Sequence, residues 1–331
     1  MFFRIQYLNH IKIFIRKTGL LLFALGLQSF VIQAQFEDFN PSPYTVESTY
    51  LKLKEAYPEV NYPKLRLNST VEVKRNLHYG STGPVSKTLD LYLPTTENTP
   101  PLILLIHGGG WVSGSKANLE DLAVGLVNKG FAVANMEYAK STEAPYPASV
   151  VDIKNALAFI DRSAATFGYN GAQKVLLGCS AGAQLASLVA LSSTSKKFGE
   201  TDKADVKVQG LINVDGILSF THPESEEGVY AAYWLGGFQE THQAVWEEAS
   251  PLNYVGKDTP PTLFINSAQP RFHAGRDDMI TLMRAFDIPF QVHTFEASPH
   301  SFWLLSPWFE PTVELIHQFI TTLFYDKTAT D

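Results

Sequence analysis

The chain has 331 residues, of which 45% are hydrophobic and 12% are aromatic, so it can bury a large core and is not intrinsically disordered. Its formal net charge is −7, but residues 1–34 hold four basic residues and no acid, so the remainder carries 22 basic and 33 acidic residues, a net charge of −11. An acidic surface repels phosphate backbones, and we therefore expect no nucleic-acid partner.

The first 34 residues have the pattern of a secretory signal peptide. A basic stretch ending at Lys17 precedes an apolar run over residues 20–27, and Ala34 provides a small residue at a cleavage point. The alternative is an uncleaved membrane anchor, but the apolar stretch is shorter than the roughly 20 residues that a spanning helix needs. No cysteine follows the stretch to carry a lipid. We expect cleavage near Ala34, export to the periplasm or the exterior of a bacterial cell, and no stable membrane insertion.

Residues 35–64 are rich in Pro, Tyr and Glu without a clear periodicity, and they predict an N-terminal arm that packs on a catalytic domain formed by residues 65–331. In that domain, predicted strands alternate with predicted helices. The strands are expected at residues 71–79, 88–93, 102–106, 131–135, 174–177, 208–214, 261–266 and 290–295, and the helices at 118–128, 148–167, 181–191 and 311–324. This alternation predicts an α/β fold with a mostly parallel central sheet, helices on both faces and an antiparallel pair of strands at its start.

One segment interrupts the alternation. Residues 220–254 lie between two predicted strands and contain Trp234, Trp246 and many acidic residues. They predict a short helical cap over the edge of the sheet where a substrate would bind.

A candidate nucleophile lies between the strand at 174–177 and the helix that starts at Ala181. Gly178-Cys179-Ser180-Ala181-Gly182 has the pattern G-x-S-x-G, which places a serine on a strained turn between strand and helix and projects its hydroxyl into a cleft. The alternative is a plain strand–helix turn, but the strand and helix that the motif requires are both predicted. Cys179 has no partner in the chain for a disulfide and is expected to be a small packing residue.

A glycine-rich loop follows the buried strand at 102–106. His107-Gly108-Gly109-Gly110-Trp111 lets backbone amides approach a developing oxyanion, and we expect Gly108, Gly109 and Ala181 to donate to it. A flexible loop or a nucleotide cradle is the alternative, but no dinucleotide or Walker motif accompanies it. Trp111 is predicted to contact the substrate.

The general base is expected after Ser180, because this fold orders its triad as serine, acid and histidine. Among the later histidines, His293 and His317 lie within predicted elements, whereas His300 lies in the loop after the last strand. His300 is therefore the predicted base, with a loop histidine of no special role as the alternative.

The acid is less clearly marked. It should follow the strand at 261–266, yet residues 267–274 hold no carboxylate. The spacing Gly-x-x-Asp after Gly275 favours Asp278, while Asp277 is an alternative that could instead begin the next helix. Asp215, at the end of the preceding strand, is a further alternative, and Glu296 is a more distant one.

Three potential cations lie in the same loop. Arg271, His273 and Arg276 could bind the carboxylate of a uronate substrate. The alternative is that they pair with neighbouring acids of this acidic protein. No cluster of cysteine and histidine indicates a metal, and no motif indicates a cofactor.

Taken together, these motifs resemble the α/β-hydrolase superfamily, and most closely its secreted bacterial carbohydrate-esterase and feruloyl-esterase-like group, related to hormone-sensitive lipase. The residues that carry the resemblance are His107 to Trp111, Glu137-Tyr138 through Tyr146-Pro147-Ala148 and Asp152, Gly178 to Gly182, and His300. It implies cleavage of acetyl, methyl or feruloyl esters on plant cell-wall polysaccharide. It also implies the roles of nucleophile, base and oxyanion hole for the residues above.

We therefore expect a secreted serine esterase that acts on short acyl or methyl esters of a polysaccharide such as xylan or pectin, without a cofactor. A lipase, a general carboxylesterase or a peptidase on the same fold is the alternative among enzymes. The acids and histidines of residues 220–254 argue against an apolar lipase lid, and the chain is too short for the propeller domain of such peptidases. A non-catalytic binding protein that kept the fold is the alternative outside enzymes.

Overall fold

The computed structural model describes residues 36, 39–80, 87–96, 98–193, 198 and 207–325. The chain divides into two units, Met1–Asn40 and Pro41–Asp331. In the first unit, the described residues are Phe36, Phe39 and Asn40, and the amide of Phe39 donates to the carbonyl of Phe36 at 2.9 Å. The predicted signal peptide over residues 1–34 lies outside the described residues. The sheet, its helices and the candidate site all belong to the second unit.

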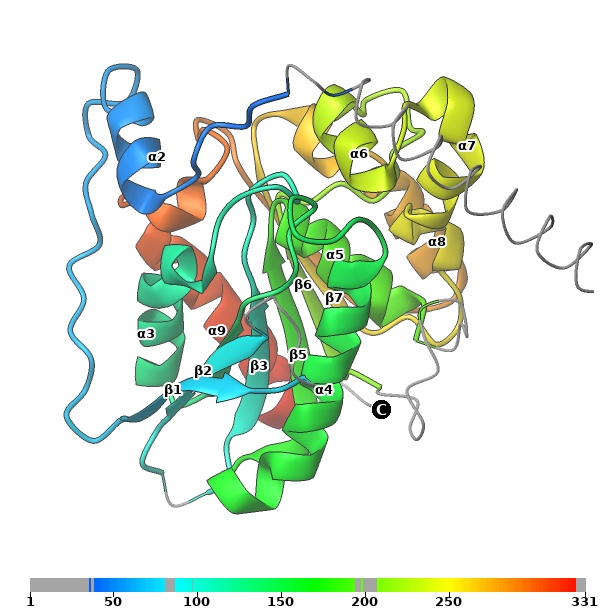
Figure 1. Cartoon of the computed structure of the whole chain (residues 1–331). Coiled ribbons are helices and arrows are strands. Elements are labelled where there is room, and N and C mark those ends of the chain that lie inside the picture. Colours follow the sequence, from blue (N-terminus) through cyan, green and yellow to red (C-terminus); the bar gives the residue numbers. More distant parts are fainter. Residues whose placement is uncertain are drawn as a thin grey trace, which may run out of the picture. The chain divides into compact units, whose positions relative to one another are not determined.

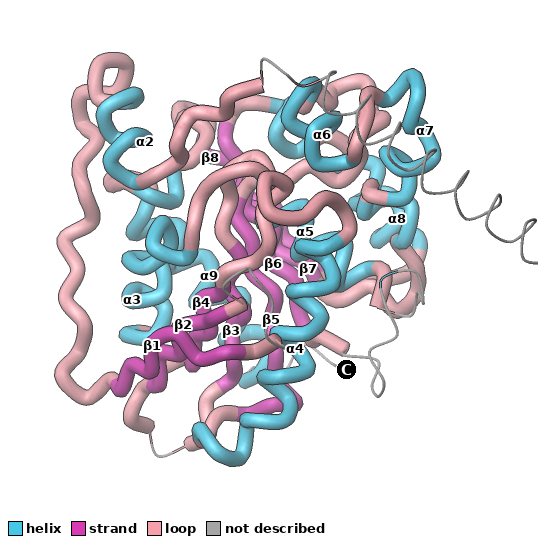
Figure 2. The backbone as a smooth tube through the Cα atoms, viewed as in Figure 1, coloured by secondary structure: helices cyan, strands magenta, loops and turns pink. Residues whose placement is uncertain are grey.

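An eight-stranded sheet forms the centre of the second unit (Figures 1 and 2). Its order is β1-β2-β4-β3-β5-β6-β7-β8, in which β2 pairs antiparallel with β1 and β4 and every other neighbouring pair is parallel. The strands are β1 (Glu72–His78), β2 (Thr88–Leu93), β3 (Pro101–Ile106), β4 (Ala132–Met136), β5 (Asn170–Cys179), β6 (Gly210–Val214), β7 (Thr262–Ser267) and β8 (Phe290–Phe295). The predicted α/β fold with a mostly parallel sheet is confirmed.

Helices cover both faces of the sheet. The described α-helices are α2 (Val46–Leu53), α3 (Glu120–Asn128), α4 (Ala148–Phe167), α5 (Ala181–Leu191), α6 (Gly228–Leu235), α7 (Gln239–Glu248), α8 (Arg276–Ala285) and α9 (Phe309–Tyr325). In Figure 1, α3 and α9 lie together on one face and α4 and α5 on the other, in agreement with the pairs that contact each other. None of the helices in the described part of the chain has the length and apolar character that a membrane span requires.

The central strands are apolar on both faces because each face is covered. Along β3, Ile103 and Leu105 join the core beneath α3 and α9, while Leu102 and Leu104 are fully buried on the opposite side. Successive side chains along a strand point to opposite faces of the sheet, so a continuous apolar run packs against the helices on both faces. Because these strands are parallel, their carboxyl ends all lie at one edge of the sheet.

The loops that follow the carboxyl ends of the parallel strands gather at that edge, where open parallel sheets usually bind their ligands. The segment 220–254 forms α6, α7 and the short 3₁₀ helix η3 (Pro251–Tyr254), between β6 and β7. Three other 3₁₀ helices occur in the described chain: η1 (Lys116–Leu119), η4 (Pro270–His273) and η5 (Phe302–Leu304).

Most predicted elements differ from the observed bounds by one or two residues, although β5 begins at Asn170 rather than at residue 174. The helix α2 was not predicted within the N-terminal arm. The side chains of Thr45 and Ser48 each accept a hydrogen bond from the other's backbone amide, which caps the start of α2. Val46, Tyr50 and Leu53 share one face of the helix and pack against the core.

Candidate active site

Ser180 lies on a sharp turn between β5 and α5. Its backbone has φ 55° and ψ −125°, a conformation that costs an L-residue energy and is characteristic of functional turns. The two flanking glycines are required by close approach. A Cβ on Gly178 would lie 2.1 Å from the carbonyl oxygen of Gly182, and one on Gly182 would lie 2.2 Å from that of Ile106. The predicted strand–turn–helix context of the motif is therefore present.

A continuous chain of polar contacts joins Ser180, His300 and Asp215. The Ser180 hydroxyl lies 2.9 Å from His300 Nε2, and His300 Nδ1 donates to Asp215 Oδ2 at 2.7 Å. The second oxygen of this carboxylate, Oδ1, accepts the backbone amide of Ser267 at 2.9 Å. The Asp215 side chain is fully buried, so its orientation is fixed by these two donors. The arrangement can remove a proton from Ser180 and stabilise the resulting imidazolium.

The structure does not bring Asp278 to the histidine, and the prediction that it is the acid is wrong. Asp278 lies in the first turn of α8 with 62% of its side chain exposed, and its carboxylate is 3.6 Å from His222 Nε2. Asp277 is also solvent-exposed and accepts from Arg276 Nε at 2.8 Å. The physical reason is that η4 occupies the loop after β7, where a carboxylate would otherwise reach the histidine. Asp215, at the end of the adjacent strand β6, takes that position with a positive φ of 53°.

Aromatic neighbours hold the His300 ring. Phe272 of η4 stacks on it with 3.5 Å between ring centroids, and Trp303 meets it edge-on at 5.1 Å. The next residue, Ser301, accepts a hydrogen bond from the hydroxyl of Tyr44 at 3.1 Å. Phe272 and Tyr44 were not predicted as site residues, since Phe272 reaches the histidine, and Tyr44 the neighbouring Ser301, from distant parts of the sequence.

The glycine loop approaches the serine as closely as backbone can. A Cβ on Gly108 would lie 2.9 Å from Cβ of Ser180, and one on Gly109, whose φ is +124°, would lie 2.1 Å from the carbonyl oxygen of Ser113. Ala181 is the first residue of α5, and the first amides of a helix have no partner within it. The loop and the start of α5 therefore place backbone amides beside Ser180, as an oxyanion hole requires.

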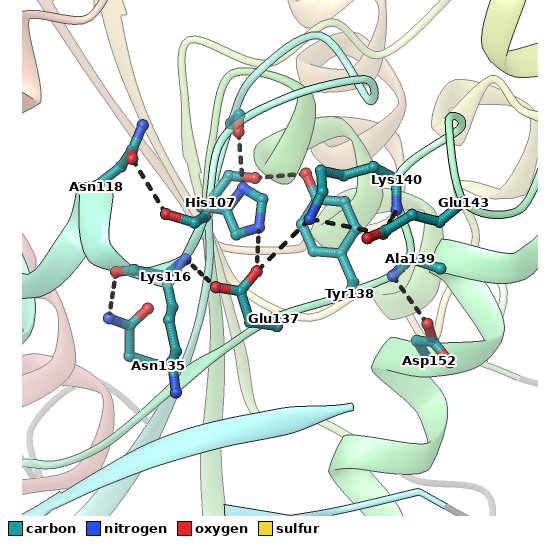
Figure 3. Close-up of polar contacts among 12 residues, drawn as sticks. His107, Lys116, Asn118, Asn135, Glu137, Tyr138, Ala139, Lys140, Glu143 and Asp152 are labelled. Atoms are coloured by element: carbon teal, nitrogen blue, oxygen red, sulfur yellow. Dashed lines mark hydrogen bonds and ion pairs between the residues drawn. The ribbon is translucent and has the colours of Figure 1, made fainter. Parts of the chain in front are cut away.

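A polar network fixes this loop from behind (Figure 3). His107 Nδ1 lies 2.7 Å from the carbonyl oxygen of Gly108, and the carbonyl of His107 accepts from the hydroxyl of Tyr138 at 2.8 Å. The rings of His107 and Tyr138 stack with centroids 4.3 Å apart. Glu137 lies 3.5 Å from His107 Nε2 and accepts the backbone amide of Lys116 at 2.9 Å. Burial raises the pKa of Glu137, but the contacts with His107 and Lys116 outweigh it and hold that pKa below its ordinary value.

The same network extends into α4. Asp152 Oδ2 accepts the amide of Ala139 at 2.9 Å, and its other oxygen pairs with Lys87 (Figure 3 shows the former contact). Ser141 donates its hydroxyl to the carbonyl of Trp111 at 2.8 Å. The segment between Glu137 and Asp152 therefore supports the glycine loop.

A cavity of about 770 Å³ opens at Ser180 and His300. Its lining includes Tyr44, Ser48 and Lys52 from the N-terminal part of the unit, and Glu227 and Tyr230 from the cap segment, residues 220–254. Glu227 is largely buried, with 12% of its side chain exposed, and Arg271 lies 3.6 Å from its Oε1. Burial raises the pKa of Glu227, and the charges of Arg271 and His300 offset this only in part. Neither α2 nor Glu227 was predicted to be part of the site.

The other predicted substrate residues lie differently. The guanidinium of Arg271 pairs with Glu226 at 3.5 Å as well as with Glu227, and Arg276 donates to Asn266 and Asp277. His273 is half-buried, and desolvation together with Arg276 lowers its pKa. None of these three lines the cavities at Ser180, which supports the alternative that they pair with acids.

Two further residues have structural roles. Trp111 is buried, stacks on Trp234 at 5.1 Å and donates to Gln184, although its side chain also borders a small cavity beside Ser180. Cys179 is fully buried, and desolvation raises the pKa of its thiol. Among the described residues, no group of His, Cys, Asp and Glu is arranged to hold a metal ion.

Comparisons with known proteins place the chain in a family. The sequence model of the BD-FAE family matches residues 89–279. Esterase LipQ of Mycobacterium tuberculosis is 26% identical over 186 residues, which are 54% of this chain and 42% of that protein. The chain thus spans less than half the length of this curated relative.

Two solved structures share the fold. A truncated carbohydrate esterase from gut microbiota has a TM-score of 0.66 and 18% identity, with 80% of this chain and 99% of that chain covered. Esterase B of Lactobacillus rhamnosis has a TM-score of 0.66 and 21% identity, with 90% of this chain and 96% of that chain covered. At such identities the likeness concerns the fold.

Proposed function

The chain belongs to the BD-FAE family of α/β-hydrolases, and from this premise we propose that it is a secreted serine esterase that removes short acyl or methyl esters from plant cell-wall polysaccharide. The observation that carries the proposal is the unbroken contact from Ser180 through His300 to Asp215 at the mouth of a large cavity.

The first half of the reaction forms an acyl-enzyme. His300 Nε2 takes the proton of Ser180, whose oxygen attacks the ester carbonyl carbon, and Asp215 stabilises the imidazolium. The negative charge on the carbonyl oxygen is met by the amides of Ala181 and Gly109. The bond to the alcohol oxygen then breaks, and His300 returns its proton to that oxygen.

The second half repeats the chemistry with water. His300 takes a proton from the water as it attacks the acyl carbon, and the acid leaves when the bond to Ser180 breaks and Ser180 regains its proton. In both halves of the reaction, every reacting group comes from this chain, from the ester or from water.

A carbohydrate is supported as the substrate by the size and lining of the large cavity. Hydroxyl, phenol and carboxyl groups at its walls, from Ser48, Tyr44 and Glu227, suit a ligand with many hydroxyls. The named carbohydrate esterase among structures with this fold is consistent with that choice.

Export is proposed from the sequence of residues 1–34 alone. Expression in a bacterial host should yield an extracytoplasmic protein whose first residue, read by mass spectrometry, follows Ala34. Retention in the cytoplasm with residues 1–34 intact would contradict this part of the proposal.

The activity is tested by measuring acetate and methanol release from acetylated xylan, acetylated pectin and methylated pectin. Wild-type protein should release product from at least one of them, and Ser180→Ala should lower the rate by about 10⁴-fold or more, because the oxygen that attacks the carbonyl is lost. Equal rates for the two proteins would overturn the proposal.

A further inference from the structure

The ring of Phe272 lies flat against the ring of His300. The two centroids are 3.5 Å apart and the ring planes meet at 12°. Since carbon atoms in contact are themselves separated by about 3.5 Å, the two faces overlap with little offset. Aromatic rings usually meet offset or edge-on instead, with centroids about 4.5–7 Å apart, because both faces carry negative charge. Trp303 shows that usual arrangement on the same histidine, at 5.1 Å and 84°.

A cation, in contrast, is attracted to the face of a phenyl ring. His300 becomes such a cation when it takes the proton of Ser180, and it remains one until it returns the proton to the leaving oxygen. We propose, building on the proposed esterase function, that the ring face of Phe272 stabilises the imidazolium of His300 and so accelerates the reaction. No bond to Phe272 forms or breaks, because the ring acts only on the energy of the charged state.

Backbone contacts at both ends of η4 hold the Phe272 ring in place. The amide of Phe272 donates to the carbonyl of Gln269 at 3.1 Å, and the carbonyl of Ala274 accepts the amide of Leu218 at 2.8 Å. The ring therefore has its position before the charge on the histidine forms, as electrostatic stabilisation of a transition state requires. The loop after β7, where the sequence predicted the acid, thus supplies an aromatic ring to the histidine instead.

Charged groups near the stacked rings come from three parts of the chain. Asp215, at the end of β6, accepts from the histidine at 2.7 Å and also favours the imidazolium. The guanidinium of Arg271 on η4 lies 4.5 Å from the centroid of the phenyl ring, and its charge opposes a second cation there. Glu226 and Glu227 of the cap segment lie 3.5 and 3.6 Å from that guanidinium and offset its charge. The other titratable residues that line the large cavity with His300 are Tyr44, Lys52, Tyr57 and Tyr230.

A stabilised imidazolium has a characteristic effect on the pH profile of kcat/KM. Loss of the stabilisation lowers the plateau above the acid limb, because the transition state contains the imidazolium whereas the free enzyme does not. In acid the free enzyme is itself protonated, so both states lose the same stabilisation and the rates of variant and wild type converge. The midpoint of the acid limb therefore moves to lower pH. A ring that only positioned the histidine would change the rate by the same factor at every pH.

The test measures kcat/KM for phenyl acetate from about pH 4.5 to about pH 9. Phe272→Leu keeps an apolar side chain but removes the ring, and replacement of Phe272 by pentafluorophenylalanine keeps the ring shape but reverses the charge of its face. Each should lower the plateau by about 5-fold to 10-fold, move the midpoint of the acid limb down by about 0.7–1 pH unit and leave the rate in acid unchanged. Phe272→Tyr keeps the ring face and should retain the wild-type profile.

Two further variants complete the experiment. Phe286→Leu is the matched control, since it makes the same change to a ring that is 36% exposed at the end of α8, and it should leave the profile unchanged. Glu227→Gln removes the titration of a carboxyl whose pKa is raised by burial, and the shift caused by Phe272→Leu should have the same size in that background.

The outcomes separate this inference from the proposed function. A loss of equal size at every pH in the fluorinated protein, or no loss in it, would overturn the role of Phe272 while esterase activity stands. The fluorinated protein also decides the matter where it differs from Phe272→Leu or where Phe272→Leu does not fold, because its ring keeps the native packing. Absence of phenyl acetate hydrolysis by the wild type at every pH would instead overturn the proposed function.

Discussion

Two largely buried acidic side chains, Glu137 behind the glycine loop and Glu227 in the wall of the large cavity, have pKa values that are shifted in opposite directions. Glu137 lies behind the glycine loop, where burial is outweighed by contacts with His107, Lys116 and Lys140, and its pKa is lowered. Glu227 lies in the wall of the cleft, where burial dominates over the partial offset from Arg271, and its pKa is raised. The protein directs more hydrogen-bond donors at Glu137 than at Glu227.

This difference separates a supporting region from a binding region. The protein itself satisfies the Glu137 carboxylate, so the loop behind it is held in one geometry, as an oxyanion hole requires. Oε1 of Glu227 is buried without a hydrogen bond within the described chain and has the guanidinium of Arg271, 3.6 Å away, to offset its burial in part. The variants below change one region at a time.

The largest effect is expected at Asp215, the residue on which the triad geometry depends. Asp215→Asn should lower kcat by about 10⁴-fold, because an amide cannot hold the His300 ring in the tautomer that accepts the serine proton. The measurement is ester hydrolysis by purified protein. Asp278→Asn is the control, and it should stay within about twofold of wild type because that carboxylate is exposed and lies against His222. A larger loss in Asp278→Asn than in Asp215→Asn would restore Asp278 as the acid.

A smaller effect is expected in the supporting region. Glu137→Gln should lower the free energy of unfolding by about 1–2 kcal/mol at neutral pH, and it should lower kcat about 10-fold as the loop loosens. Since the folded pKa is lowered, the stabilisation by Glu137 is present above its ordinary pKa of 4.5 and is lost as pH falls through the folded pKa. Denaturant unfolding of both proteins should therefore converge in acid.

The control for this variant is Glu143→Gln in the same network. Glu143 accepts the amide of Lys140 at 3.0 Å, a bond that a glutamine oxygen can keep, so stability should change by less than about 0.5 kcal/mol. A pH-independent loss in Glu137→Gln would show that its charge does not stabilise the loop.

The smallest effect, and the opposite sign, is expected at the cleft wall. Glu227→Gln should raise the free energy of unfolding by up to about 1 kcal/mol near pH 8, because the buried charge is removed. The folded pKa of Glu227 is raised, so the cost of its charge is absent below 4.5, grows as pH rises through that value and levels off above the folded pKa. Unfolding curves near pH 4 should therefore show little difference between variant and wild type.

Glu226→Gln is the matched control for the cleft wall, since Glu226 also pairs with Arg271 but is largely exposed. It should change stability by less than about 0.5 kcal/mol at either pH. Destabilisation by Glu227→Gln near pH 8 would mean that its pairing with Arg271 outweighs its burial.

Much of this structure could be predicted from local patterns. The apolar run of β3 and the glycines around Ser180 predicted the central sheet and the turn because burial on two faces and close backbone approach each restrict residue type locally. His300 could be chosen because it is the histidine placed in the loop after the last strand. Asp215 was recognised only as an alternative, because its contact with His300 depends on η4 filling the loop after β7.

The cleft walls could not be predicted in the same way. Glu227 looks like one acid among many in a polar segment, and only the fold places it beside Ser180. The helix α2 did leave a local signal, in the pair Thr45 and Ser48 and the spacing of its apolar residues. Its role as a wall of the large cavity depends on contacts between residues far apart in the sequence.

The most direct measurement of Ser180 as the activated nucleophile is the mass of the intact protein after reaction with a fluorophosphonate, followed by mapping of the modified peptide. One adduct on the peptide that contains Ser180 is expected, formed slowly in Asp215→Asn and not formed in Ser180→Ala. An adduct on a different serine, or labelling of Ser180→Ala at the wild-type rate, would contradict the assignment.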